Sequence, residues 1–388
     1  MYDVIVVGAG PSGATAARLC ASCGLKTILI EKKRLPRDKP CAGGLTLAAV
    51  KQLGFPLPDE IIERKCSGFR ITYGNHTNIV AFNDTVTYTI NRKTFDLFLV
   101  DKALEEGVEL RDGVECLRVE TLKDRVMVKT KEGEIHGGIV IGADGVYSNV
   151  LRSFKGYFGK NEKRFCITAE ILLPEEEISE RMGDLIDIHF SSAPPGYAWL
   201  FPKKNHISAG MGCGFSRSKE LISKFKEFLA VHNLRSDIPL KGYFIPVFNS
   251  SRRVIAERVM LCGDAAGFVD PFSGEGIRFA IISGRLAAQT AASSFKKGDF
   301  STRSIEEYEE KCHTAFWKDL ECAERMSNRL LKNPRIVLKT AIGSKKALYN
   351  YLRTITGEIP LWEFLKWMKK RAIFYIIKKL LSRSPRKK

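Results

Sequence analysis

The sequence of 388 residues lacks the features that mark membrane-spanning, secreted or disordered chains. It has no uncharged apolar run near the about 18 residues of a spanning helix, so we expect no transmembrane segment. The chain opens with Tyr2–Val7, without a basic region or a small-residue cleavage site, so we expect a cytoplasmic protein rather than a secreted one. With 44% hydrophobic and 27% charged residues, the composition favours one large or two interlocked globular domains.

Paired metal-binding cysteines are also missing. The sequence has ten cysteines, but Cys20 and Cys23 form the only C-x-x-C pair and both fall in a predicted helix. No second pair completes a zinc site, so we interpret the two as packed residues and expect no metal centre. In a reducing cytoplasm we expect all ten to be free thiols.

Acidic residues are scarce at the C-terminal end. Residues 332–388 hold 16 Lys and Arg against Glu358 and Glu363, which is +14 of the formal net charge of +18. From Pro360 to Arg383, apolar residues recur at three- and four-residue spacing among the basic ones. This pattern predicts a helix lying on an anionic membrane surface, hence peripheral membrane association. The alternative is a helix packed on the body. We expect no nucleic-acid partner, because no binding module accompanies the charge.

The first 31 residues predict a dinucleotide-binding unit. The β-branched run Val4–Val7 indicates a buried strand, and the G-x-G-x-x-G of residues 8–13 opens a helix directly after it. A second strand, Thr27–Ile30, ends at Glu31. This order of strand, glycine loop, helix, strand and acid is typical of nucleotide-binding α/β folds.

Each residue type in this unit has a physical reason. Gly8 makes the tight turn, Gly10 lets the backbone approach a pyrophosphate, and Gly13 lets the helix pack on the sheet. The helix N-terminus around Ser12 offers free N–H groups to an anion. Glu31 is placed to accept hydrogen bonds from a ribose.

Two later strands end in further nucleotide-binding patterns. The strand before Asp144 ends in Gly-Ala-Asp-Gly, and the strand before Asp264 ends in Gly-Asp and is followed by Gly276 and Ile277. An Asp at such a strand end can hold a second ribose while nearby amides bind phosphates. With the N-terminal unit, these segments resemble the three fingerprints of FAD enzymes of the hydroxylase-like fold. The resemblance implies FAD and an α/β, Rossmann-like domain with an inserted antiparallel-sheet substrate domain.

Four segments carry a closer resemblance. They are the cysteine loop Lys39–Leu45, the R-x-x-x-D segment within Asn91–Leu99, the full P-x-x-Y-x-W-x-F-P of Pro194–Pro202, and Asp264–Ile277. Together they resemble the geranylgeranyl reductase family of FAD-dependent oxidoreductases, which includes archaeal digeranylgeranylglycerophospholipid reductases.

The resemblance implies an enzyme that saturates C=C bonds of geranylgeranyl chains, with membrane glycerolipid precursors as the isoprenoid lipid substrate. It leaves the electron donor open among ferredoxin, reduced deazaflavin and NAD(P)H. The residues expected to bind the cofactor are Gly8, Gly10, Ser12, Gly13, Glu31, Cys41, Ala42, Gly44, Arg92, Cys116, Asp144, Asp264, Gly276 and Ile277.

Residues of the aromatic segment and the cysteine loop are the candidates for substrate binding and catalysis. Tyr197, Trp199 and Phe201 alternate, so on a strand they form one wall suited to a long apolar chain. The alternative is an ordinary sheet face packed on a helix. Cys41 is the candidate catalytic residue, either donating a proton to the alkene or shaping the flavin face. We interpret Gly210–Gly214 as a glycine-rich strand near substrate or flavin.

Two other functions stay open. One is an FAD monooxygenase or halogenase, although Gly267 stands where such hydroxylases commonly carry a His, and no halogenase lysine motif is present. The other is a membrane-associated flavoprotein that only carries electrons. Along the chain we expect a discontinuous FAD-binding domain, an inserted substrate domain and a helical C-terminal region that starts with one long helix over 305–331. The expected boundaries are 1–65, 90–155 and 250–298 for the FAD-binding domain, 66–89 and 156–249 for the substrate domain, and 299–388 for the C-terminal region.

Overall fold

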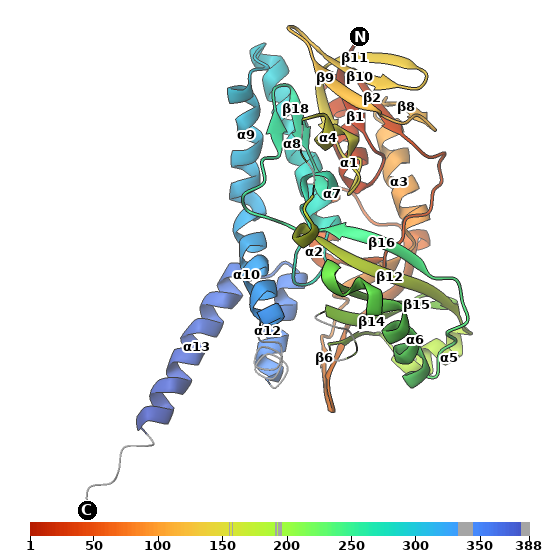
Figure 1. Cartoon of the computed structure of the whole chain (residues 1–388), viewed down its shortest axis with the longest axis vertical. Helices are drawn as coiled ribbons and strands as arrows, with labels where there is room; N and C mark the ends of the chain where they lie inside the picture. Colours follow the sequence, from red (N-terminus) through yellow and green to blue (C-terminus); the bar gives the residue numbers. More distant parts are fainter. Residues whose placement is uncertain (155, 157, 191, 193–195, 333–343, 382–388) are drawn as a thin grey trace, which may run out of the picture.

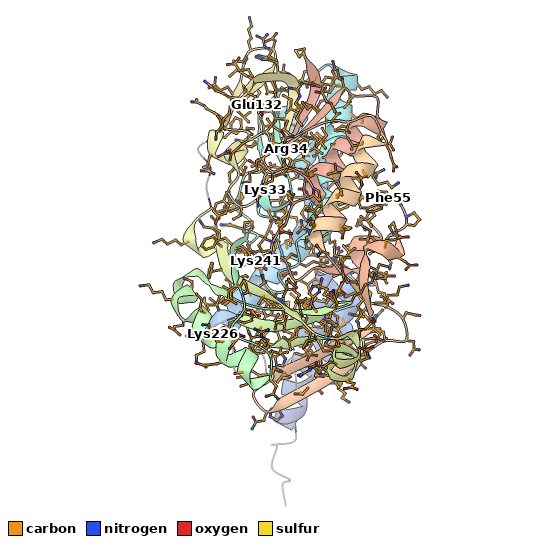
Figure 2. The ribbon with its side chains drawn as sticks, turned by 90° about the vertical axis from the view of Figure 1, so that its right-hand side faces the viewer. Lys33, Arg34, Phe55, Glu132, Lys226 and Lys241 are labelled. Carbon is orange, nitrogen blue, oxygen red and sulfur yellow. The ribbon has the colours of Figure 1, made fainter. Side chains whose placement is uncertain are left out.

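The computed structural model describes residues 1–154, 156, 158–190, 192, 196–332 and 344–381. Two large sheets lie at opposite ends of the body, and helices from the C-terminal region run along one side of it (Figure 1). The side chains of both ends are drawn in Figure 2, where Arg34 and Lys226 mark the two sheets' regions.

An eight-stranded sheet forms the N-terminal end, with strand order β17-β18-β11-β1-β2-β8 and β9 and β10 beside β11. β1 lies at its centre, parallel to β2 and β11, and Val4–Val7 is buried as the β-branched run predicts. The predicted strand, helix, strand unit is confirmed as β1, α1 and β2. The strands are β1 (Tyr2–Val7), β2 (Thr27–Glu31), β8 (Glu109–Asp112), β9 (Arg118–Thr121), β10 (Val126–Thr130), β11 (Gly133–Gly142), β17 (Ile255–Ala256) and β18 (Val259–Leu261).

Helices pack tightly against this sheet. A Cβ on Gly284 would lie 2.3 Å from the carbonyl oxygen of Ser12, so glycine lets α8 approach α1. Phe95 of α3 is fully buried in the same core. The helices here are α1 (Pro11–Ser22), α2 (Leu47–Val50), α3 (Arg92–Leu104), α4 (Asn149–Ser153), α7 (Gly263–Ala266) and α8 (Ile277–Lys297).

A seven-stranded sheet forms the other end, in the order β16-β12-β15-β14-β13-β5-β6. The sequence predicts an antiparallel sheet, whereas this sheet is mixed, because β5 enters from an earlier part of the chain and pairs parallel to β13. Helices α5 (Glu175–Met182) and α6 (Leu221–Val231) cover one face. The strands are β5 (Gly68–Tyr73), β6 (His76–Ala81), β12 (Lys163–Leu172), β13 (Leu185–His189), β14 (Gly196–Pro202), β15 (His206–Gly214) and β16 (Lys241–Pro246). Short 3₁₀ turns flank these elements at Asp59–Ile61, Lys160–Glu162 and Phe215–Glu220.

A three-stranded sheet of β3 (Gly44–Thr46), β7 (Thr87–Ile90) and β4 (Ile62–Cys66) joins the two ends. The expected boundaries at 65/66 and 89/90 cut through β4 and β7. We therefore propose a substrate domain built on the seven-stranded sheet, with the three-stranded sheet as its connection to the FAD-binding domain.

The C-terminal region is helical. The long helix expected over 305–331 is α9 (Thr302–Cys312) and α10 (Lys318–Lys332), joined by a π-helical turn at His313–Trp317. α12 (Lys345–Ile355) and α13 (Leu361–Leu381) follow, and α13 extends away from the body (Figure 1). Of the helices within the described ranges, none combines the length and apolar character required to cross a membrane.

Candidate active site

A cavity of about 330 Å³ lies where the two large sheets meet the C-terminal helices. Its cofactor end is lined by the loops after β1, β2 and β11 and by the start of α8. Its other end is lined by the seven-stranded sheet, α10 and α12. The cavity therefore combines residues from all three regions expected from the sequence.

The glycine loop after β1 offers a cradle for a dinucleotide. Gly8 adopts φ +103°, and a Cβ there would lie 2.4 Å from the carbonyl oxygen of Ala143. A Cβ on Gly13 would lie 1.8 Å from the oxygen of Gly8, so the fold itself requires both glycines. A Cβ on Gly10 would meet only the Arg37 guanidinium, at 3.6 Å. The space in front of Gly10 thus fits a pyrophosphate at the uncapped N-terminus of α1, where Ser12 lines the cavity.

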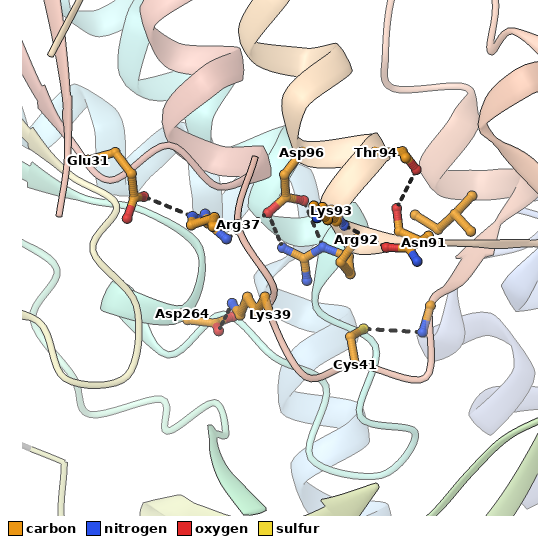
Figure 3. Close-up of polar contacts among 12 residues, drawn as sticks. Glu31, Arg37, Lys39, Cys41, Asn91, Arg92, Lys93, Thr94, Asp96 and Asp264 are labelled. Carbon is orange, nitrogen blue, oxygen red and sulfur yellow. Dashed lines mark hydrogen bonds and ion pairs between the residues drawn. The ribbon is translucent and has the colours of Figure 1, made fainter. Parts of the chain in front are cut away.

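Glu31 ends β2 as predicted, but protein groups already hold its carboxylate. One oxygen lies 3.1 Å from Arg37 (Figure 3) and accepts from the backbone N–H of Ala9 at 3.0 Å. The other accepts from the N–H of Lys33 at 3.1 Å. A ribose contact would share this carboxylate with the protein. Arg37 carries no sequence signal that separates it from its basic neighbours.

Arg92 and Asp96 form a buried bidentate ion pair one turn apart on α3, with N–O distances of 2.7 and 2.9 Å (Figure 3). Arg37 adds a third contact, 3.2 Å from Asp96. Burial lowers the pKa of Arg92, but the charges and bonds of Asp96 and Cys41 raise it further, so the pKa lies above its ordinary value. The positive charge of Arg92 is therefore permanent, and the side chain lines the cavity.

The cysteine loop runs between β2 and β3, with Cys41, Ala42 and Gly44 lining the cavity. The Cys41 thiol accepts from the N–H of Gly43 at 3.3 Å (Figure 3). Behind the loop, the buried Lys203 donates to the carbonyl of Ile90, whose own N–H donates to Gly43 at 2.8 Å. These bonds fix the direction in which the thiol points.

The third nucleotide pattern lies at the start of α7 and α8. Asp264 forms an ion pair with Lys39 at 2.9 Å, and it lines the cavity together with Gly276 and Ile277 (Figure 3). Burial raises the pKa of Asp264, but the charges of Lys39 and Arg92 lower it further, so the carboxylate is ionised at neutral pH.

Five predicted cofactor residues do not line the cavity: Gly8, Gly13 and Glu31, described above, and Asp144 and Cys116. Asp144 accepts from the Ser148 hydroxyl at 2.6 Å and from the backbone N–H groups of Asn149 and Val150 at 2.7 and 3.1 Å, so it caps α4. The Cys116 side chain is buried in the main core, and its carbonyl accepts from Asn149. The sequence does not distinguish a carboxylate that caps a helix from one that faces a ligand.

The aromatic segment forms one wall of the cavity. Tyr197, Trp199 and Phe201 lie on the same side of β14 and all line the cavity, whereas Pro194 and Pro195 lie outside the described residues. A Cβ on Gly210 would lie 2.1 Å from the Trp199 ring, so the glycine-rich strand β15 gives the indole room to lie on the sheet. The indole N–H of Trp199 is buried, and no residue in the described part of the chain accepts a hydrogen bond from it.

Sequence reasoning missed the polar network at the loop before α8. Glu275 lines the cavity and accepts from the Thr46 hydroxyl at 2.5 Å, and burial raises the pKa of its carboxyl. The Tyr197 hydroxyl donates to the carbonyl of Ser273. Glu275 belongs to a segment that the sequence singled out, but nothing in that segment indicated a bond to Thr46.

The cysteines within the described ranges are free, Cys20 buried and Cys23 exposed, and no group of three metal-binding side chains occurs among these residues. The cradle at Gly10 and the paired charges of Arg37, Arg92 and Lys39 fit FAD.

Known proteins agree with this geometry. A family model described as "FAD binding domain" matches residues 1–209. Digeranylgeranylglycerophospholipid reductase 3 of Methanosphaera stadtmanae is 32% identical over 79% of this chain and 81% of that protein. A geranylgeranyl bacteriochlorophyll reductase-like protein of Thermoplasma acidophilum is 25% identical with a TM-score of 0.80, covering 94% of this chain and 95% of the other. The flavin-dependent halogenase CmlS, 17% identical with a TM-score of 0.71, covers 98% of this chain and 78% of its own and shares the fold alone. The cofactor of this chain is FAD, and its fold is the hydroxylase-like fold of these flavoproteins.

Proposed function

The chain belongs to the geranylgeranyl reductase family of FAD-dependent oxidoreductases, and from that membership we propose that it saturates the geranylgeranyl chains of membrane glycerophospholipid precursors. The observation that carries this proposal is the single cavity shared by the FAD cradle at Gly10 and the aromatic wall of β14. An apolar chain on that wall lies in the same space as the cofactor loop.

The proposal assigns the cofactor to the residues at one end of the cavity. The glycine loop and the N-terminus of α1 hold the pyrophosphate, while Glu31 and Asp264 accept from hydroxyl groups of the bound FAD. Asp144 and Cys116 act indirectly, because they support the loops around it. Reduced FAD supplies a hydride equivalent to one alkene carbon when it is bound.

The remaining work falls to the side chains around the alkene. Tyr197, Trp199 and Phe201 orient the chain and exclude water, which keeps each isolated C=C in one position. The second alkene carbon needs a proton. Cys41 is our candidate donor, because its thiol lines the cavity and is fixed by the N–H of Gly43 and by Arg92.

The test uses the holoenzyme with its flavin reduced anaerobically. We expect a geranylgeranyl glycerophospholipid to reoxidise the flavin and to gain two hydrogens per turnover, as measured by absorbance and mass spectrometry. Reoxidation by oxygen alone with a hydroxylated or halogenated product would favour the monooxygenase alternative. No reoxidation by either would favour an electron carrier.

We also propose that α13 attaches the enzyme to an anionic membrane surface. The first turns of α13 pack on the body, since Leu361 and Phe364 are buried in a cluster with Cys322 and Ala323 of α10. Beyond them Lys369, Lys370 and Arg371 are exposed, and the helix extends away from the body (Figure 1). The proposal therefore assigns the packed interpretation to the first turns of α13 and the membrane interpretation to the residues beyond them.

This division determines where the chain is cut to test the anchor. A chain ending at Arg371 keeps the packed turns, so we expect it to fold and retain FAD but to sediment less with phosphatidylglycerol vesicles than the full chain does. Binding of the full chain should weaken with added salt, because salt screens the headgroup attraction. Equal sedimentation of the two chains would show that the rest of α13 is not the anchor.

A further inference from the structure

Helix α12 separates the apolar end of the cavity from the outside of the molecule. Tyr351, Leu352 and Ile355 line the cavity from its inner side. Leu348 and Leu352 are buried in one apolar cluster with side chains of the seven-stranded sheet. On the outer side Tyr349 is 45% exposed and stacks on Phe82, with ring centroids 4.8 Å apart. Helix α12 therefore has one side on the cavity and the other facing outward.

Tyr351 connects this helix to two other parts of the molecule. Its ring makes edge contacts with Phe272 of the loop before α8 and with Phe364 of α13, each at a centroid distance of 5.7 Å. Its hydroxyl bonds to Ser273, the residue whose carbonyl accepts from Tyr197 of the aromatic wall. Tyr351 thus lies between the cavity and the base of α13.

The base of α13 is attached to α10 by specific contacts. Asp319 accepts from the N–H of Trp362 at 3.1 Å, and the Lys318 ammonium lies 3.9 Å from the centre of the Trp362 ring. The end of α12 is also held, because Lys51 donates to the carbonyl of Thr356 at 3.1 Å, next to Gly357 with φ +75°. The N-terminal half of α12 is held on the sheet by the apolar contacts of Leu348 and by the stacking of Tyr349 on Phe82.

We propose that α12 is a lipid gate: an isoprenoid chain enters the cavity when α12 leaves the seven-stranded sheet, and seating of α13 on an anionic lipid surface favours that open position through Phe364 and Tyr351. The inference deepens the proposed function and rests on it for the identity of the chain. An effector shifts such an equilibrium only if it binds the two positions differently. Opening exposes the apolar side chains of Leu348 and Leu352. Exposure to water is unfavourable, whereas contact with a lipid interface is not, so a membrane stabilises the open position relative to the closed one.

The gate is tested with a fluorescent reporter that needs no prenyl substrate. Cys23→Ser removes the exposed thiol, Tyr349→Cys carries a bimane label, and Phe82→Trp places a quenching indole against it. We expect phosphatidylglycerol vesicles to abolish the quenching in the full chain. Its emission should then equal that of a control chain that carries the same label but keeps Phe82. Phosphatidylcholine vesicles, or the chain ending at Arg371, should leave the quenching in place.

Variants at Tyr351 test the coupling. Tyr351→Phe keeps both ring contacts but loses the bond to Ser273, so we expect partial loss of quenching before vesicles are added. Tyr351→Ala removes the contact to Phe364, so vesicles should no longer change the emission. Persistent quenching in a full chain that sediments with the vesicles would overturn the gate. Because the reporter reads α12 without turnover, this result would leave the reductase proposal standing, and absence of reductase activity would not alter the reporter.

Discussion

The two ends of the cavity are built by opposite means. At the cofactor end, charged side chains pair with one another, Arg92 with Asp96, Lys39 with Asp264, and Arg37 with Asp96 and Glu31. At the other end, where we propose that the isoprenoid chain binds (the chain end), aromatic rings lie on a sheet whose glycines give them room. The first end is specified by charge and the second by volume.

This difference has a physical reason. A dinucleotide brings charge, and buried charges are tolerated only when they are paired and hydrogen-bonded. An isoprenoid chain brings apolar surface, which gains from burial in proportion to its area and has no directional demands. Substitutions at the two ends should therefore separate FAD retention from chain turnover.

The largest effect is expected at the glycine loop. Gly10→Leu should fold, because a Cβ there meets only the Arg37 guanidinium, at an ordinary contact distance of 3.6 Å, but its side chain fills the cradle and should abolish FAD binding. Flavin absorbance after gel filtration, with a thermal melt as the folding check, measures this. Gly8→Leu is the contrast: it clashes with the backbone at Ala143 and should fail to fold. Full flavin content in Gly10→Leu would place the pyrophosphate elsewhere.

The second effect concerns the charge pairs. Asp96→Ala leaves Arg92 buried without its bidentate partner, which should lower the free energy of unfolding by about 3–5 kcal/mol and weaken FAD retention. Asp101→Ala, on the exposed side of the same helix, should change the free energy by less than about 0.5 kcal/mol. Denaturant titration compares the two. Equal, small losses would mean that the pair contributes little at the cofactor end.

The third effect tests the junction between the ends. Cys41→Ser should keep FAD while slowing lipid-dependent flavin reoxidation about 100-fold, the range for loss of a positioned proton donor. Cys213→Ser is the matched control, because Cys213 also lines the cavity, but burial raises the pKa of its thiol to about 11 and the mechanism gives it no role. Anaerobic stopped-flow absorbance measures both. A wild-type rate in Cys41→Ser would reduce Cys41 to a packing residue.

Site residues can be predicted from the sequence where their positions are set by nearby residues in the chain. The glycine loop, the strand ends at Asp264 and the alternating wall of β14 could be predicted because turns, strand periodicity and residue type act within a few neighbouring positions. Arg37 could not, because it lies in a run with four other basic residues, and only the fold shows that it faces Glu31 and Asp96.

Long-range contacts also stayed hidden. Tyr351 lines the cavity because α12 packs on a sheet formed by residues much earlier in the chain. The periodicity of α12 predicts a helix but does not indicate which element it packs on. The same holds for the parallel pairing of β5 with β13. Asp144 is a further case: its role as a helix cap depends on Ser148 and on the turn into α4, and the strand-end pattern alone does not indicate that cap.

The smallest effect separates the two faces of a single strand. Trp199 and Leu200 are neighbours on β14, but Trp199 faces the cavity and Leu200 is buried against the α5 and α6 side of the sheet. Trp199→Ala removes a large ring from the wall of the cavity, so we expect FAD content to hold and KM for a geranylgeranyl lipid to rise about 30-fold, equivalent to about 2 kcal/mol. Leu200→Ala should do the opposite, lowering the free energy of unfolding by about 2–5 kcal/mol with little change in KM. Steady-state kinetics and denaturant titration on both variants decide between them. If Trp199→Ala instead loses as much stability as Leu200→Ala and leaves KM unchanged, the aromatic wall is part of the core, and the chain end of the cavity must lie elsewhere.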